Sequence, residues 1–242
     1  MKKRIVSAVM GVVMAVGMLS GECFAAGSQT RTVEVVLDSS SGTVNGEAVE
    51  VEIVAANTDM NSTNDFTVVS VPEAVQPVYN YVINQSRENV SAAEILEGVR
   101  SENPDTTINV VSRHVDEEGN LVTEEADEEL NAYLETASSL TAPFELYPRY
   151  KDGDVIDELD EAKTVLKVLE LQALYELNKD NQELLDSIRL ECWVTLEDGS
   201  VEVQVIKPVS IDLEKGHIEL ELGNLVSCMA TILYDKELAI LE

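Results

Sequence analysis

The sequence is poor in the side chains that most often carry enzyme chemistry. Its 242 residues include two histidines, three cysteines and one tryptophan, and 16 lysines and arginines stand against 46 aspartates and glutamates. The shortage of cations excludes nucleic acid and anionic membrane surfaces as partners, because a chain of net charge −30 repels their phosphates. The acidic charge can instead attract cationic partners, bind divalent cations or simply keep the protein soluble.

Motifs of nucleophilic catalysis are missing as well. The sequence has no Gly-x-Ser-x-Gly elbow and no Ser-x-x-Lys. The two histidines, His114 and His217, are too few for a structural zinc site, and we expect both at solvated strand ends. Paired carboxylates for glycoside hydrolysis are abundant, but the aromatic platforms of such sites are not, since Trp193 is the one tryptophan.

The first 25 residues have the order of a cleavable secretory leader. Lys2-Lys3-Arg4 precedes the apolar run Ile5–Leu19, and small residues follow at Ala25-Ala26-Gly27. Charged, apolar and small-residue regions in this order are typical of a signal peptide. A run of about 15 apolar residues falls short of the roughly 20 that a membrane-spanning helix needs. We therefore expect cleavage after Ala25 or Ala26 and a secreted, extracellular protein.

Retention by a lipid or by insertion in the membrane is not expected. Glu22 precedes Cys23, where a lipidation site would have a small residue. No second apolar run of membrane length follows the leader. Removing residues 1–25 takes three cations and one acid from the 16 and 46, which leaves 13 and 45 and a net charge of −32.

Two cysteines, Cys192 and Cys228, remain after loss of the leader. Each lies in a segment where apolar residues alternate, which places both on the buried face of a strand. An even pair in an oxidising compartment favours a disulfide. Closing that loop would contribute about 4 kcal/mol by the chain-entropy argument. Two unpaired core thiols are the alternative, because a free cysteine packs well as a small hydrophobic residue.

Residues 27–142 are expected to form an α+β domain. Strands are predicted at Thr32–Leu37 and Ala48–Ala55, joined as a hairpin through a connector that ends in Asn45-Gly46. Further predictions are a strand at Phe66–Val71, a helix from Pro72, a helix opened by the capping box Ser91–Glu94, a strand at Thr106–Val115 that returns through Leu121-Val122, and a helix capped by Thr123 that runs to Leu134.

Residues 143–242 are expected to form an antiparallel β-sandwich. Four alternating segments follow one another at roughly ten-residue spacing, a pattern typical of such folds. They are Ile188–Leu196, Ser200–Ile206, His217–Leu222 and Leu225–Tyr234, with turns at Glu197–Gly199, Lys215-Gly216 and Gly223-Asn224. The segment Asp157–Asn178 has helical composition and spacing, yet Thr164–Leu169 also fits a buried strand.

The C-terminal hundred residues resemble a β-sandwich module of secreted and surface proteins of Gram-positive anaerobes. The resemblance rests on four stretches: Thr141–Leu146, Ile188–Trp193, Gly199–Val203 and Gly216–Ser227. Cys228-Met229 stands where such modules usually continue with a proline-containing turn. The resemblance implies an immunoglobulin-like accessory or binding module without catalytic residues, and it implies a strand at Lys163–Leu169.

Calcium is the inorganic ligand that the acidic loops suit best. Asp152, Asp154 and Asp157 concentrate carboxylates beside Gly153, and Asp116–Asn120 forms a second acidic loop. Neither loop fits an EF-hand, whose glycine stands at the sixth position. A solvated acidic loop is the alternative for both.

Two functions follow from these observations. The first is a secreted or cell-surface, non-enzymatic protein that binds a protein or glycan in adhesion or as an envelope accessory. The second is a secreted hydrolase with a carboxylate site between the two halves, near Pro143–Asp154. A closed junction with an exposed apolar or strand-edge patch would favour the first function. A cleft with two carboxyl groups within glycosidase distance would favour the second.

Overall fold

The structure is a computed structural model that describes residues 33–36, 42–57, 90–141 and 143–240. In these ranges the protein is mostly β, and its strands pair into two multi-stranded sheets. The β-rich character of the predicted fold is therefore confirmed. The predicted leader, the strand at Phe66–Val71 and the helix from Pro72 lie outside the described residues.

The smaller sheet contains six strands. Their order is β12-β13-β9-β2-β3, and β1 also pairs with β9. All of these pairings are antiparallel. The strands are β1 (Val33–Val35), β2 (Gly42–Val44), β3 (Glu47–Val49), β9 (Leu159–Val168), β12 (Ser210–Asp212) and β13 (His217–Leu225).

The larger sheet contains eight strands. Their order is β4-β8-β14-β10-β11-β5-β6, and β7 also pairs with β14. The pairing of β5 with β11 is parallel and the others are antiparallel. The strands are β4 (Val51–Asn57), β5 (Ile108–Val115), β6 (Leu121–Glu125), β7 (Ala137–Ser139), β8 (Phe144–Tyr150), β10 (Arg189–Thr195), β11 (Val201–Ile206) and β14 (Cys228–Asp235).

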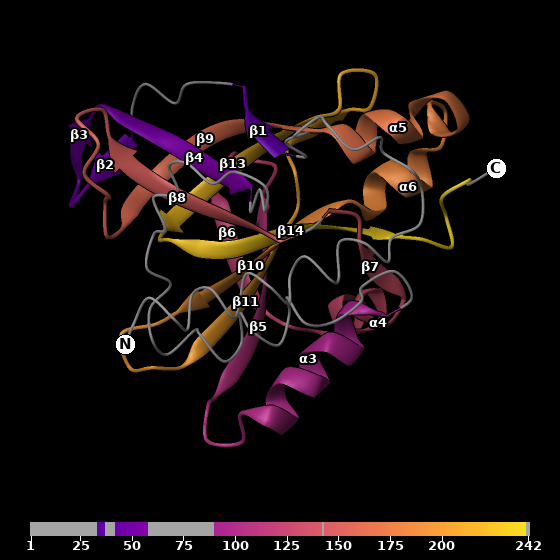
Figure 1. The fold of residues 1–242 in the computed structure, drawn as a ribbon, viewed down its shortest axis with the longest axis horizontal. Helices are drawn as coiled ribbons and strands as arrows, with labels where there is room; N and C mark the ends of the chain where they lie inside the picture. The colour runs from indigo at the N-terminus through magenta and orange to yellow at the C-terminus, as the bar shows by residue number, and fades with distance from the viewer. Residues whose placement is uncertain (1–32, 37–41, 58–89, 142, 241–242) are drawn as a thin grey trace, which may run out of the picture.

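The larger sheet is the middle of three layers. One face packs on the smaller sheet, and the other is covered by α3 (Ala92–Glu102) and α4 (Glu128–Thr136), which Figure 1 shows on the opposite side from β9 and β13. β10 shows the division, because Leu190 and Cys192 enter the core between the sheets while Trp193 enters the core under the helices.

Two further helices, α5 (Leu169–Asn178) and α6 (Gln182–Ser187), follow β9 and lead into β10. Among the residues that the structure describes, no helix is long and apolar enough to span a membrane.

Local hydrogen bonding explains where α3 and α4 begin. The predicted capping box is confirmed: Ser91 Oγ accepts from the N–H of Glu94 at 3.2 Å, and the Glu94 carboxylate accepts from the N–H of Ser91 at 2.9 Å. The predicted cap at Thr123 is wrong. β6 continues to Glu125, and Asp127 caps α4 by accepting from the N–H of Leu130 at 2.8 Å.

The ambiguous segment Asp157–Asn178 contains both structures. Leu159–Val168 forms the long strand β9, and α5 starts at the next residue. In β9 the residues Ala162, Thr164, Leu166 and Val168 are buried in alternation, so neighbouring strands on both sides decide the conformation against local helix propensity.

The predicted N-terminal hairpin has a correct turn and a wrong pair of strands. Asn45 and Gly46 have φ of 52° and 75°, and they join β2 to β3 in a two-residue hairpin. β1 pairs with β9 instead. The predicted single strand Ala48–Ala55 is interrupted at Glu50, where the chain leaves the smaller sheet and enters the larger one as β4.

The second half differs from its prediction in two places. The predicted turn at Gly223-Asn224 belongs to β13, which continues to Leu225, and the chain turns at Val226-Ser227. The four predicted strands also fall into different sheets, since β13 joins the smaller sheet while β10, β11 and β14 join the larger one.

The two halves of the chain are joined by strand pairing. Strands β4 and β5, which precede residue 142, pair with β8 and β11, which follow it. Both predicted segments of the chain therefore contribute to one sheet.

Candidate functional site

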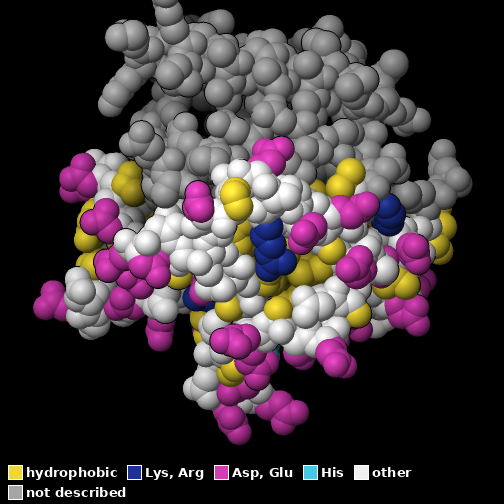
Figure 2. All heavy atoms as spheres, turned by 90° about the horizontal axis from the view of Figure 1, so that it is seen from below, with side chains coloured by type: hydrophobic (Ala, Val, Ile, Leu, Met, Phe, Trp, Pro, Cys, Tyr) yellow, Lys and Arg dark blue, Asp and Glu magenta, His cyan; other side chains and the backbone are white. Residues whose placement is uncertain are grey.

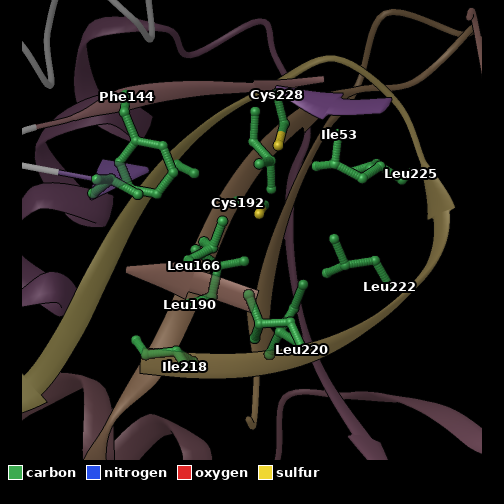
Figure 3. Close-up of a cluster of buried hydrophobic side chains, with 14 of the residues drawn as sticks. Ile53, Phe144, Leu166, Leu190, Cys192, Ile218, Leu220, Leu222, Leu225 and Cys228 are labelled. Atoms are coloured by element: carbon green, nitrogen blue, oxygen red, sulfur yellow. The ribbon is translucent and has the colours of Figure 1, made fainter. Parts of the chain in front are cut away.

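The two cysteines lie side by side in the core between the sheets. Cys192 on β10 stands opposite Ala230 on β14, and Cys228 is two residues before Ala230 on the same strand. Their exposed fractions are 1% and 6%, and both are free thiols in the structure. Figure 3 shows both sulfur atoms among the apolar side chains of this core. The expectation that both cysteines lie on buried strand faces agrees with this placement.

The surroundings of Cys192 keep its thiol protonated. A hydrogen bond with Cys228 and burial away from water raise the pKa of Cys192 well above its ordinary value, and the charge of Arg113 opposes this only in part. A thiol of this kind is a poor nucleophile, because the thiolate is the reactive form. The cysteine pair therefore suits a structural or covalent cross-linking role.

A buried polar cluster joins the two sheets near one end. Arg113 on β5 is 8% exposed, and its Nη1 donates to the carbonyl oxygen of Gly223 on β13. Its Nη2 lies 3.9 Å from the Glu202 carboxylate, which also accepts from Gln204 at 2.8 Å. Sequence reasoning missed this cluster, because its members are brought together from three strands.

The calcium candidates Asp152, Asp154 and Asp157 lie in the loop between β8 and β9, and all three are exposed. The loop is organised by its backbone, since the N–H of Tyr150 donates to the Asp154 carbonyl at 2.8 Å and Gly153 adopts a φ of 104°. Within the described part of the chain, no three His, Cys, Asp or Glu side chains are grouped so as to hold a metal ion. Calcium binding stays a prediction.

The second acidic loop, Asp116–Asn120, is closed by its own first residue. The Asp116 carboxylate accepts from the N–H of Asn120 at 2.7 Å and from the N–H of Glu118 at 3.0 Å. The hydrogen bonds from Asn120, followed by those from Glu118, lower the pKa of Asp116 in spite of some desolvation. This carboxylate therefore already has a structural task in the turn.

Two glutamates have pKa values well above the ordinary range. Burial raises the pKa of Glu145, on β8, to about 7, and burial raises that of Glu170, at the start of α5, to about 7 as well. Glu170 Oε2 is buried and has no hydrogen-bond partner in the described ranges. Glu145 lies in the stretch where the sequence predicts a junction, so it is the described carboxyl with the best claim to acid–base chemistry there.

The two histidines lie at or near strand ends, and the tryptophan lies in the interior. His114 lies on β5 opposite Val122, and His217 begins β13 opposite Asp212. Trp193 is 1% exposed under the helices, so its ring is not available as a sugar platform.

No protein-family model matches this chain, and no match was found among curated proteins or among solved structures.

Proposed function

We propose that this protein is a secreted or cell-surface protein that acts by binding rather than by catalysis, in adhesion or as an accessory of the cell envelope. The observation that carries the proposal is the exposed edge of the larger sheet at β6. The predicted leader and the net charge of −30 support a dispersed protein outside the cell.

The backbone of β6 has hydrogen-bonding groups that point away from its neighbour. The N–H of Ala126 donates to Val110 and the N–H of Asp116 donates to Asn120, so the even-numbered residues of β6 face β5. By the alternation of antiparallel ladders, the N–H and C=O groups of Thr123 and Glu125 face outward. Among the described strands, none pairs with this side of β6.

An outward strand edge of this kind is a template for an added strand from a partner. Thr123, Glu124 and Glu125 are exposed at this edge. Two adjacent carboxylates favour an extended peptide segment with lysines or arginines. Acidic side chains are also spread over the face shown in Figure 2, so charge attracts such a partner broadly while the strand edge supplies the specific hydrogen bonds.

The stretch Pro143–Asp154 begins inside the larger sheet. Phe144 and Leu146 are 1% and 0% exposed in the core, because β8 lies between β4 and β14 in the larger sheet. Phe144–Leu146 therefore belongs to the core of the larger sheet, whereas Asp152 and Asp154 of the same stretch lie in an exposed loop. We also propose that the strands of residues 143–242 form the immunoglobulin-like module that this part of the sequence resembles, which the antiparallel pairing of β10 with β11 and β14 supports.

The hydrolase alternative has one observation in its favour, the raised pKa of Glu145. Glu52, a carboxylate on the adjacent strand β4, is four positions away in the register, since Ala56 stands opposite Glu145 and Glu52 opposite Arg149. Four residues of strand separate the two backbone positions by about 13 Å, whereas the carboxyl groups of an inverting glycosidase lie at most roughly 9.5 Å apart. Glu52 is also engaged by Arg149 at 2.6 Å. This ion pair makes Glu52 a poor partner for Glu145 in a glycosidase site.

The test is capture of partners from secreted protein, cell-wall material and glycans by the wild-type protein and two β6 variants. Thr123→Pro removes an outward N–H and leaves the ladder to β5 intact, whereas Thr123→Ala keeps that N–H. We expect Thr123→Pro to lose a protein partner that Thr123→Ala retains. Equal capture by both variants contradicts binding at the β6 edge. Hydrolysis of glycan or ester substrates that Glu145→Gln abolishes contradicts the non-enzymatic assignment.

A further inference from the structure

The cysteine pair is a part of the core that the binding proposal leaves unused. Its position on the neighbouring strands β10 and β14 is independent of the β6 edge.

The ladder between β10 and β14 brings the two side chains to the same face. Ile232 donates its N–H to Thr141 and accepts from the N–H of Leu140, so its backbone groups face away from β10. The same holds for Ala230, two residues earlier, which makes Cys192 and Ala230 a non-hydrogen-bonded pair, the kind with the closer side chains. Cys228 is the diagonal neighbour of Cys192 across this pair.

The separation of the two Cα atoms expected for diagonal neighbours is close to the separation that a disulfide spans. Diagonal residues on antiparallel strands are about 7–8 Å apart, with shorter separations between Cβ atoms. A disulfide joins Cα atoms up to about 6.8 Å apart. Cys228 is the first residue of β14 and directly follows the connection Val226-Ser227. Bridging the pair therefore requires the two Cα atoms to approach by up to about 1 Å, and at a strand end such a movement disturbs few ladder hydrogen bonds.

We propose that Cys192 and Cys228 form a disulfide between β10 and β14 during oxidative folding, and that the folded core then seals this bond from reductants. The oxidant is a disulfide of low molecular weight, or that of a thiol oxidoreductase. One thiolate attacks it and releases one thiol, and the second cysteine then displaces the other thiol from the mixed disulfide. Two protein thiols and one disulfide become one protein disulfide and two free thiols.

The burial of the two cysteines protects the disulfide from reductants. The two cysteines are 1% and 6% exposed, and Phe144, Leu190 and Leu220 of the same core are at most 1% exposed. A reductant must reach a sulfur atom in line with the bond, which requires this core to open. The oxidised state, once formed, is therefore retained in the folded protein.

The first experiment uses the full chain with Cys23→Ser, which leaves only the two core cysteines. The protein is unfolded, refolded with glutathione disulfide, unfolded again and alkylated, and its intact mass is measured without reduction. We expect a mass two units below the dithiol form and a single peptide that contains Cys192 linked to Cys228. Two alkylated thiols, or a stable glutathione adduct, would overturn the proposal.

The second experiment measures access to the bond. Dithiothreitol is added to the oxidised protein under native conditions and, in parallel, in denaturant. We expect reduction of the native protein to be at least about 100-fold slower than that of the unfolded protein. Equal reduction rates in the native and unfolded protein would show that the folded core does not protect the bond. Cys192→Ala and Cys228→Ala, each with one thiol, serve as controls that form no intramolecular bond.

Discussion

The guanidinium of Arg113 donates a hydrogen bond to the carbonyl oxygen of Gly223, across 110 residues of sequence, and so connects β5 of the larger sheet to β13 of the smaller one. β12 pairs with β13 only as far as Glu219, so in the described fold this carbonyl lies beyond the last pairing at that edge. One buried side chain thus satisfies a main-chain oxygen where the two sheets meet.

Replacing this arginine should be costly. Arg113→Met leaves the Gly223 carbonyl and the Glu202 carboxylate without their cation, and we expect a loss of about 3 kcal/mol in the free energy of unfolding. Urea denaturation measures this loss. Arg113→Lys should recover only part of it, because a single ammonium does not reproduce the two-sided guanidinium contact. A loss below about 0.5 kcal/mol for Arg113→Met would show that the contact is unimportant.

Gly216 is required both for its backbone conformation and for its lack of a side chain. Its φ is 68°, and a Cβ there would collide with the carbonyl oxygen of Val168. Gly119 has a φ of 86° but open space around it, so it isolates the conformational effect. We expect Gly119→Ala to cost about 1 kcal/mol and Gly216→Ala about 2 kcal/mol or more, measured by thermal or urea unfolding. Equal losses of stability in the two variants would show that the collision between the added Cβ and the Val168 carbonyl has no effect.

The two helix caps should make similar contributions. Ser91→Ala removes the side-chain acceptor for the N–H of Glu94, and Asp127→Ala removes the acceptor for the N–H of Leu130. Each variant should lose about 1 kcal/mol in the free energy of unfolding. Ser101→Ala, an exposed substitution near the end of α3, should change stability by less than about 0.5 kcal/mol and provides the matched control. A larger loss in the control would contradict the assignment.

Stability should fall as the pH rises from about 4.5 to about 7. Burial raises the pKa of Glu145 and Glu170 to about 7, so in this window the folded protein binds more protons than the unfolded chain. Their contribution is therefore present at the acidic end and is lost as pH rises through the folded-state pKa. Glu145→Gln and Glu170→Gln should flatten the pH dependence of unfolding and raise stability at pH 8. Glu97→Gln, at an exposed position of α3, should leave the profile unchanged.

Several elements follow from the sequence because their signals are local. The capping box at Ser91, the Asn45-Gly46 turn and the alternating strands that contain Cys192 and Cys228 all depend on residues within one turn or one strand. The alternation also places both cysteines on the buried face. The same reasoning fails at Thr123, where a usable capping residue competes with Asp127 and pairing with β5 extends the strand past it.

The sequence by itself determines the charge, the shortage of catalytic side chains, the leader-like N-terminus and the positions of most described strands. Only the tertiary structure decides which strands pair, because alternation identifies a buried face without naming the partner. This is why β1 pairs with β9, β5 runs parallel to β11, and helix-forming residues after Asp157 enter a strand. The contact between Arg113 and Gly223 and the diagonal placement of the cysteines belong to the same class. They arise from packing between segments far apart in the chain, where burial outweighs local preference.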